Sequence, residues 1–486
     1  MARIRLNGQN YGGAHYARIS SEQCERLHNA SLEILSRTGV RLHDQEAIDL
    51  LSSAGAHVSD GNRVRIQAGM VERAFSTVPK RVTLYDRCGR PAMYLEGSNC
   101  YYGTGSDCLK IIDHRTGERR LAVLQDVVDG MIVCDALPHI DFVMSMFLPS
   151  DVNPFVSDRH QMEVILNKTT KPVVYVTNEF SGCVDCVEMA EIVAGGADRL
   201  RLRPFAACYI NVTTGLVHNE EALQKLLFLA GKGLPALYIP VVTGGINGPI
   251  TAAGGLASAN AGVLAGLVLS QLKREGTPFI ISGMSGGGLD MRTMVGPYCS
   301  PNEKGMAHAL GHYYRLPQFG LGGCSESKLV DQQAAAEAAL TLMSETLGGA
   351  NLIHDLGYLE SGLCGSLAQL VICNEIVGWI EHMLAPVEIN DETLGLDLID
   401  QVGPEGSFLD SDHTMRHFRS RWYPDVFERG NYDQWLASGG KSLGERAAAR
   451  VARVLEKHVP EPLPVDVAHA IRAVVERAEA GFGDAG

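Results

Sequence analysis

Eight short apolar runs recur along the middle of the chain, and segments with helical spacing separate them. They read CYYGTG, DFVMSMF, PVVYVTN, PFAACYINV, PALYIPVVT, PFIISGM, PQFGLGG and NLIHDLG, at residues 100–105, 141–147, 172–178, 204–212, 235–243, 278–284, 317–323 and 351–357. Continuous apolar runs of this length are typical of strands that are buried on both faces of a parallel sheet. The pattern therefore predicts eight strands, each followed by a helix.

The number and spacing of these units predict the architecture of the central region. Five of the eight strands begin at a proline or one residue after it, directly after a helix end. Eight β-α units between residues 99 and 394 match a (β/α)8, or TIM, barrel. A doubly wound open sheet is the alternative, but no G-x-G-x-x-G follows a predicted strand. We therefore predict an α/β chain with a TIM barrel.

Both ends of the chain have a different pattern from the barrel. In residues 1–98, SSEQCERLHNASLEILSRTG and HDQEAIDLLSSAG have helical spacing, and RVTLYDRCGRPAMYLEG alternates around a turn as a hairpin does. This region is predicted to be an N-terminal α/β cap. Residues 395–486 are rich in charged residues and are predicted to form a helical C-terminal extension.

One uncharged stretch, from Leu234 to Leu272, is long enough to raise the question of a membrane span. A span needs about 20 continuous apolar residues. Prolines, glycines and an asparagine interrupt the first part, so we predict a buried helix at 258–274 and no contact with a membrane. The first residues, MARIRLNGQNYGG, contain no apolar core of a secretory signal. We expect a cytoplasmic protein.

Charge and cysteine content exclude some functions. The net charge of -14 disfavours nucleic acid as a partner, because nucleic acid requires a basic surface. The twelve cysteines are scattered, and Cys183 and Cys186 form the single C-x-x-C pair, without a second pair or a nearby histidine. We predict that both pack in a helix and that the protein has no metal site.

Candidate chemistry lies at the carboxyl ends of the strands, where active sites of barrels collect. These ends are polar and rich in glycine, and carry few charges. His354 and Asp355 directly follow a buried apolar run, which is costly unless the pair is used or hydrogen-bonded. Asp107 caps its loop or contacts a ligand, and Glu326 forms an exposed pair with Lys328 or belongs to the site.

Other familiar sites are absent from the sequence. GMSGGG has the glycines of a phosphate-binding loop but lacks the following Lys-Ser/Thr, and no G-x-S-x-G motif of a serine hydrolase occurs. Asp331 precedes QQAAAEAAL and is predicted to be a helix N-cap.

Several long motifs resemble the trimethylamine methyltransferase family. YYGTGSDC and IIDHRTGERR are similar to its first strand and hairpin, and GCSESKLVDQQAAAEAALT and NLIHDLGYLESGL to its seventh and eighth units. FLDSDHTMRHFRSRWYPDVFERGNYDQWLASG resembles its C-terminal region. The resemblance implies a barrel enzyme that moves a methyl group from a methylated amine to a cobalt corrinoid, or cobalamin, carried by a separate protein.

One departure from the family narrows the expected substrate. Members of the family that act on trimethylamine itself carry a pyrrolysine, whereas all 486 residues here are standard ones. The resemblance is therefore to the non-pyrrolysine branch, which is known for quaternary amines such as glycine betaine. Transfer to Co(I) releases a neutral tertiary amine, so no general acid is required and His354–Asp355 is expected to orient the substrate.

The resemblance implies roles for particular residues. A cationic head group would meet aromatic faces or a carboxylate, and a betaine carboxylate would need hydrogen-bond donors. The candidate substrate-binding residues are Tyr101, Tyr102, Asp107, Phe147, Asn178, Asn211, Phe319, Glu326, His354, Asp355 and Tyr358. Alternation places only one of Tyr101 and Tyr102 inside the barrel. The candidate corrinoid-facing loop residues are Gly105, Ser106, Gly244, Gly245, Ser285, Gly286 and Gly323.

The expected partners are a corrinoid protein and a small quaternary amine, and we expect a homo-oligomer. Two other functions fit the sequence. One is a divergent barrel methyltransferase with another methyl donor, and the other is a betaine-binding protein without catalytic activity.

Overall fold

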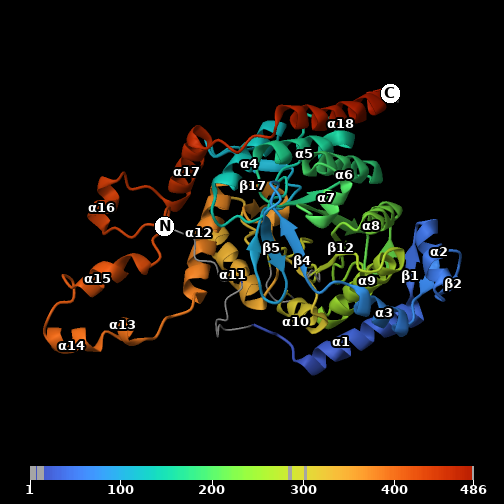
Figure 1. The fold of residues 1–486 in the computed structure, drawn as a ribbon, viewed down its shortest axis with the longest axis horizontal. Helices are drawn as coiled ribbons and strands as arrows, with labels where there is room; N and C mark the ends of the chain where they lie inside the picture. The colour runs from blue at the N-terminus through green and yellow to red at the C-terminus, as the bar shows by residue number, and fades with distance from the viewer. Residues whose placement is uncertain (1–6, 8–15, 283–286, 300–303, 484–486) are drawn as a thin grey trace.

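A parallel sheet of seven strands forms the centre of the structure (Figure 1). The computed structural model describes residues 7, 16–282, 287–299 and 304–483. Along the sheet the strand order is β6, β15, β14, β13, β12, β10, β9, and each neighbouring pair is parallel. The strands are β6 (Tyr101–Tyr102), β9 (Val173–Val176), β10 (Ala206–Val212), β12 (Ala236–Pro240), β13 (Phe279–Ser282), β14 (Gln318–Leu321) and β15 (Leu352–His354).

The predicted strand at 141–147 is wrong as a continuous strand. Phe142 pairs with Gly103 beyond the end of β6, and Val143 pairs with Val173 of β9, each as a single parallel bridge. At the next position, hydrogen bonds to the Thr104 side chain take the place of the backbone hydrogen bonds of a strand pair. The Thr104 hydroxyl accepts one from the Met144 amide and donates one to the Met144 carbonyl. The segment therefore bridges both edges of the sheet without forming a full strand.

A helix follows each sheet strand, as predicted, and α4 and α5 flank the bridging segment. These helices are α4 (Leu124–Ala136), α5 (Ser157–Lys168), α6 (Phe180–Ala194), α8 (Glu220–Lys232), α9 (Ala252–Lys273), α10 (Lys304–Tyr314), α11 (Gln332–Gly348) and α12 (Leu367–Leu384). The short α7 (Ala197–Leu202) follows α6. The predicted N-cap is confirmed, since the Asp331 carboxylate accepts a hydrogen bond from the Ala334 amide.

Helix α9 accounts for the uncharged stretch. It begins at Ala252, six residues before the predicted start, and by length and composition it could cross a membrane. In the structure, 83% of its most apolar window is buried. It packs against the cap helices α1 (Ser21–Glu33) and α3 (Ala68–Thr77), against α8, and against β12 and β13.

A hairpin covers one face of the sheet at its amino-terminal end. The predicted hairpin is confirmed as β4 (Val82–Tyr85) and β5 (Pro91–Leu95). Leu84 and Met93 of this hairpin are buried in one cluster with inward-facing strand residues such as Leu237, Phe319 and Leu352. Because the hairpin packs into the amino-terminal end, ligand chemistry is left to the carboxyl end of the strands.

The N-terminal cap combines helices with a small sheet. Its helices are α1 (Ser21–Glu33), which continues as the π-helix η1 (Ile34–Thr38), α2 (Gln45–Ser53) and α3 (Ala68–Thr77). The sheet has the order β11, β1, β3, β2, with β1 (Val40–Leu42), β2 (His57–Ser59), β3 (Arg63–Arg65) and β11 (Val217–His218). Strand β11 lies between β10 and α8, so its pairing with β1 attaches the cap to the central region.

The C-terminal region consists of two packed helices and a projecting segment. Helix α17 (Leu443–Lys457) packs on α12 and α4, and α18 (Val465–Gly483) packs on α5 and α6. Between α12 and α17 the chain extends away from the body (Figure 1). This segment contains α13 (Asp391–Leu394), α14 (Leu396–Val402), α15 (Asp412–His417), η4 (Phe418–Ser420) and α16 (Tyr432–Ala437).

The inward-facing cluster yields a stability prediction. Leu352 is fully buried in it, whereas Leu340 on α11 is 58% exposed. We expect Leu352→Ala to lower the free energy of unfolding by about 2–5 kcal/mol, from lost burial and the cavity left behind. The matched control Leu340→Ala should change it by about 0.5 kcal/mol or less. Urea denaturation followed by circular dichroism measures both, and equal effects would contradict this account of the core.

Candidate functional site

Two loops that are far apart in sequence meet at the carboxyl end of β6 and β15. They form a four-stranded sheet with the order β16, β17, β7, β8, from β7 (Lys110–Ile112), β8 (Arg119–Leu121), β16 (Tyr358–Leu359) and β17 (Cys364–Gly365). The Tyr358 hydroxyl accepts a hydrogen bond of 2.9 Å from the Asp107 amide and donates one of 3.3 Å to the Met146 carbonyl. Tyr358 thus joins the first and last units of the central region.

Asp355 lies at the centre of this contact. Its backbone adopts φ of 76°, a left-handed conformation that aspartate tolerates better than most residues. One carboxylate oxygen accepts a hydrogen bond of 2.5 Å from the Tyr298 hydroxyl. Asp355 and Tyr358 pack directly over the Cα of Gly105, where a β-carbon would overlap Asp355 Oδ1 and lie 2.5 Å from the Tyr358 ring. A glycine is therefore required at 105.

His354 is part of an aromatic stack beneath Asp355. Its ring stacks on Phe319 at 4.0 Å between centroids, and Tyr209 meets the Phe319 ring edge-on at 5.6 Å. His354 Nδ1 lies 2.6 Å from the Gly320 carbonyl oxygen and therefore carries a proton. Nε2 lies 3.4 Å from Asp355 Oδ1. The imidazole ring thus contacts both the Phe319 ring and the Asp355 carboxylate.

The two aspartates and three tyrosines influence one another electrostatically. Asp107 is exposed to solvent at the edge of this contact, and the surrounding protein removes part of the hydration of its carboxyl. This partial loss of hydration raises the pKa of the Asp107 carboxyl, the hydrogen bond from the Ser106 hydroxyl lowers it, and the nearby Asp355 carboxylate raises it again. Burial also raises the pKa of Tyr209, and the charges of Asp355 and Asp107 raise it by smaller amounts. Two carboxylates and neutral phenols therefore occupy one small region.

Burial likewise raises the pKa of Tyr298 and of Tyr358 well above the ordinary value for tyrosine. The nearby Asp355 carboxylate raises both pKa values further. We refer to Asp107, Tyr209, Tyr298, Asp355 and Tyr358 as the rim cluster. It brings carboxyl groups and aromatic rings together, although Asp355 and Tyr358 are themselves buried, and this is the combination that binds a cation such as a methylated ammonium. Its tyrosines stay protonated at neutral pH and are unsuited to act as bases.

Three predicted aromatic candidates lie elsewhere. Tyr101 faces the interior, but at the opposite end of the strand, where its hydroxyl accepts a hydrogen bond from the Tyr94 amide of the hairpin. Tyr102 faces outward and its hydroxyl is hydrogen-bonded to the Thr346 hydroxyl of α11. Phe147 is fully buried outside the sheet and packs against Gly365. None of the three reaches the rim cluster.

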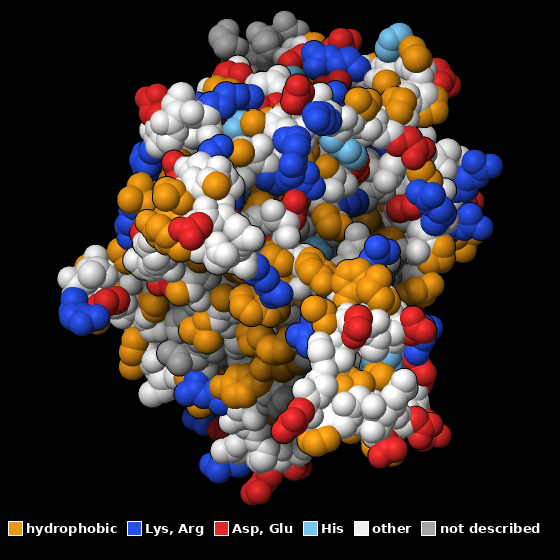
Figure 2. Space-filling view, turned by 90° about the vertical axis from the view of Figure 1, so that its left-hand side faces the viewer, with side chains coloured by type: hydrophobic (Ala, Val, Ile, Leu, Met, Phe, Trp, Pro, Cys, Tyr) orange, Lys and Arg blue, Asp and Glu red, His pale blue; other side chains and the backbone are white. Residues whose placement is uncertain are grey.

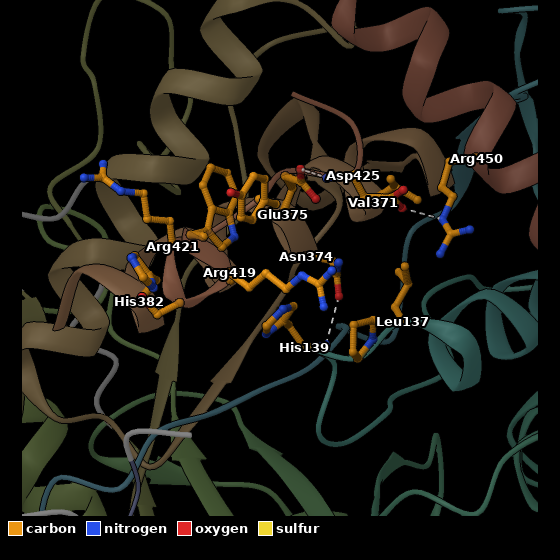
Figure 3. A pocket seen from close by; sticks show the side chains of 15 residues that line it. Leu137, His139, Val371, Asn374, Glu375, His382, Arg419, Arg421, Asp425 and Arg450 are labelled. Atoms are coloured by element: carbon orange, nitrogen blue, oxygen red, sulfur yellow. Dashed lines mark hydrogen bonds and ion pairs between the residues drawn. The ribbon is translucent and has the colours of Figure 1, made fainter. Parts of the chain in front are cut away.

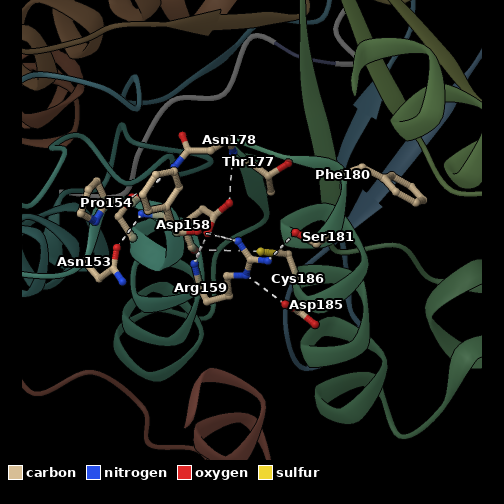
Figure 4. A network of polar contacts seen from close by, with 12 residues as sticks. Asn153, Pro154, Asp158, Arg159, Thr177, Asn178, Phe180, Ser181, Asp185 and Cys186 are labelled. Atoms are coloured by element: carbon tan, nitrogen blue, oxygen red, sulfur yellow. Dashed lines mark hydrogen bonds and ion pairs between the residues drawn. The ribbon is translucent and has the colours of Figure 1, made fainter. Parts of the chain in front are cut away.

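Asn178 is held by structural contacts. Its amide nitrogen donates to the Pro154 carbonyl, and its backbone N–H donates to the Asp158 carboxylate. Asp158 belongs to a network centred on the buried Arg159, whose guanidinium also pairs with Asp185 (Figure 4). This network fixes the loop after β9 against α5 and α6, so Asn178 positions a loop.

Two further polar candidates have different positions. Asn211 is exposed and lies two residues after Tyr209, hence on the same face of β10. Glu326 holds two loops together: its carboxylate accepts hydrogen bonds from the Cys299 amide and from the Ser361 hydroxyl. It thereby keeps the Tyr298 loop against the loop that carries Asp355 and Tyr358.

The predicted loop residues are distributed along the same end of the sheet. The Ser106 hydroxyl donates to the Asp107 carboxylate. Gly244 forms bridges with Gly248 and Gly288, which join the loops after β12 and β13, and Gly245 adopts φ of 89°. Gly323 adopts φ of 79° and packs against Leu356. Ser285 and Gly286 lie outside the described residues.

Sequence reasoning missed Tyr209 and Tyr298. Strand alternation was the available signal for Tyr209, because it precedes the candidate Asn211 by two residues in a predicted strand. Tyr298 lies 57 residues from its partner Asp355, in a loop without periodic pattern. No local signal could have connected these two.

Cys183 and Cys186 pack inside the protein on α6, as predicted. Among the described residues, one group has the composition and proximity of metal ligands: Glu392, His413 and His417 in the projecting segment. The three are in contact with one another, and Arg416 pairs with the Glu392 carboxylate. The group belongs to the C-terminal region and not to the rim cluster.

Comparison with known proteins supplies the family. The sequence profile of trimethylamine methyltransferase (MTTB) matches residues 8–483. The chain belongs to the trimethylamine methyltransferase family. It is 35% identical to trimethylamine methyltransferase MttB of Desulfitobacterium hafniense (strain DSM 10664 / DCB-2), over 99% of both chains. It is 28% identical to the glycine betaine methyltransferase of D. hafniense (strain Y51), over 95% of this chain and 96% of the other.

Similarity to a solved structure is weaker. The monomethylamine methyltransferase MtmB of Methanosarcina barkeri superposes with a TM-score of 0.48 at 12% identity, over 93% of this chain and 91% of that one. The family membership confirms the resemblance noted in the sequence and identifies the protein as a methyltransferase.

The close packing over Gly105 yields a second prediction. We expect Gly105→Ala to destabilise the protein by about 1–3 kcal/mol, since the new methyl group overlaps Asp355 and Tyr358. The control Gly69→Ala, in helix α3 with open space around its Cα, should be neutral or slightly stabilising. Thermal melting measures both. An unchanged melting temperature in Gly105→Ala would refute the close approach.

Proposed function

We propose that this protein transfers a methyl group from a quaternary ammonium compound, glycine betaine or a related betaine, to the Co(I) corrinoid of a partner protein. The observation that carries the proposal is the rim cluster. Two carboxylates and three aromatic rings converge at the carboxyl end of the strands. A quaternary ammonium group carries a fixed positive charge and methyl substituents. Its charge is attracted to the carboxylates, and its methyl groups make cation–π contacts with the aromatic rings.

The reaction makes modest demands on the protein. The Co(I) centre of the partner supplies the nucleophile as a substrate of the reaction. The carbon–nitrogen bond breaks and its electron pair stays on nitrogen, so the product is a neutral tertiary amine and no proton moves. The protein contributes positioning and exclusion of water. Tyrosines that stay protonated suit this role, since no acid or base is needed.

The residues divide into two roles. Asp355, Asp107 and the Tyr209, Tyr298 and Tyr358 rings surround the ammonium group. His354 acts beneath them as an orienting element for Asp355. A betaine carboxylate is repelled by the aspartates and must point away from them, and the exposed amide of Asn211 is the donor on that side.

The methyl acceptor requires a surface on which a partner can lie. Exposed apolar side chains occur on loops that follow several strands, including Leu109, Ile246, Met291, Leu329 and Leu363. Since parallel strands end at one edge, these loops surround the rim cluster. An apolar border around a charged centre suits a large, flat macrocycle presented by another protein.

We further propose that the sheet closes into a (β/α)8 barrel. The parallel bridges of Phe142 to Gly103 and of Val143 to Val173 support closure through the residues between α4 and α5. Closure would bring the β6 and β9 loops to one rim.

Two other functions fit the same fold. A divergent methyltransferase with another donor would show turnover with a thioether or a methoxy compound and none with betaines. A betaine-binding protein without catalysis would bind the ligand in a calorimeter and give no methylated corrinoid.

We expect the purified protein, glycine betaine and Co(I) cobalamin to yield methylcobalamin and dimethylglycine. Asp355→Asn should weaken the binding of tetramethylammonium and of glycine betaine by about tenfold, since one charge is lost from the cluster, equivalent to about 1.4 kcal/mol. Asp290→Asn is the matched control, because Asp290 follows β13 but pairs with Arg292. Calorimetry measures affinity, and absorbance of methylcobalamin measures turnover. Equal affinities in the two variants would refute the proposed cation site.

The raised pKa of Asp107 yields a prediction for pH. A raised value means that this carboxylate takes up a proton at higher pH than an ordinary aspartate, and a protonated carboxyl does not attract a cation. Affinity for tetramethylammonium should therefore fall on acidification from neutral pH before ordinary aspartates titrate. In Asp107→Asn the fall should be smaller. Identical pH profiles would exclude a role for Asp107.

A further inference from the structure

The segment from 385 to 440 is a projecting arm that packs on the body mainly at its root, where Trp422 stacks on Trp379 and Val426 is buried. Its four α-helices, α13 to α16, have between four and seven residues each and bury no residue. Helices this short are unstable in water without tertiary contacts. Figure 1 shows the arm extending away from the body between α12 and α17. It therefore lacks the contacts that normally stabilise such helices.

The arm exposes an unusual share of the apolar surface. Of the 31 large hydrophobic side chains that are exposed in the described part of the chain, 12 lie on the arm. The most exposed are Val387, Ile389, Leu396, Leu409, Met415 and Tyr432. Figure 2 shows the face from which the arm projects, with hydrophobic side chains gathered across its centre and Lys and Arg side chains above them. Exposed apolar groups on this scale indicate a protein interface.

The charges of the arm are separated along the sequence. Residues 386–415 contain eight acidic residues and no lysine or arginine. Among them, Asp397 and Asp400 lie three residues apart on α14, exposed and without an ion pair in the described chain. Arginines follow at 416, 419 and 421. The arm thus has an acidic outer part and a basic return segment.

The basic return segment lines a pocket at the root of the arm. This pocket of about 620 Å³ lies between α12, residues 137–139 and residues 419–425 (Figure 3). Its acidic groups are already satisfied: Glu375 accepts hydrogen bonds from three successive backbone amides, of residues 425–427, and Asp425 pairs with Arg450. Arg419 and Arg421 have no carboxylate partner within the described chain. The pocket therefore carries two positive charges that are not neutralised by an ion pair.

We infer that the arm is exchanged between two copies of this chain, with the acidic α14 of each copy docked at the Arg419–Arg421 pocket of the other. In Figure 1, α14 lies at the outer end of the arm, whereas the pocket lies against α12 and contains no residue of α14, so a second copy of the chain would supply the occupant. One chain carries both complementary surfaces, which is the requirement for a two-fold symmetric, self-complementary interface. Contacts of Arg416, His413 and His417 with Glu392 hold α13 against α15 and preform the arm for docking.

The test is a charge exchange. Light scattering coupled to size exclusion should find the wild-type chain as a dimer or a larger assembly of dimers. The acid reversal Asp397→Arg/Asp400→Arg and the base reversal Arg419→Glu/Arg421→Glu should each weaken self-association by about 100-fold or more, through like-charge contacts. The control Asp198→Arg/Arg199→Glu, on α7 away from the arm, should associate as wild type does.

Mixing makes the test specific. An equimolar mixture of the two reversed variants should form heterodimers, because each arm again meets a pocket of opposite charge. A chain carrying all four reversals should dimerise with itself, which also shows that the substituted chains fold. The milder pair Asp397→Asn and Arg419→Gln should weaken association in the same direction.

Several results would overturn the exchange. These are a wild-type chain that is monomeric at all concentrations, a dimer that survives both reversals, or a mixture without heterodimers. A monomer that uses the arm only to hold the corrinoid protein would likewise overturn it. None of these outcomes depends on methyl transfer, so the inference stands or falls separately from the proposed function.

Discussion

The contact of Asp355 and Tyr358 with the bare Cα of Gly105 organises the whole candidate site. It brings the loop after the first sheet strand against the loop after the last one, and no residue larger than glycine fits between them. From this contact the hydrogen bonds extend outward, to Asp107 through Tyr358 and to Tyr298 through the Asp355 carboxylate. The aromatic stack of His354, Phe319 and Tyr209 supports it from the sheet below.

The site is held rigidly by groups that do not belong to it. Glu326 ties the Tyr298 loop to the loop after β15, and the Arg159 network fixes the loop after β9. The left-handed backbone at Asp355 is held by the hydrogen bond from Tyr298 and by the packing over Gly105. Preorganisation of this kind suits a displacement in which the protein supplies position and charge and takes no part in proton transfer.

The C-terminal region presents the opposite situation. Helices α17 and α18 pack on the outside of the central helices, whereas the four short α-helices of the arm bury no residue. Twelve of its large apolar side chains are exposed, and Asp397, Asp400, Arg419 and Arg421 have no ion pair within the described chain. Exchange between two copies would bury apolar surface and pair these charges.

The sequence by itself determined the alternation of strands and helices, the hairpin at residues 82–95 and the Asp331 cap, because these depend on local periodicity and local hydrogen bonds. It also located His354 and Asp355 at a strand end. Tertiary structure alone decided which side chains meet there. Tyr101 and Tyr102 were plausible by position, but one faces the closed end and the other faces outward. Tyr298 joins the site through a loop without pattern, because contacts between distant segments follow from packing and leave no local trace.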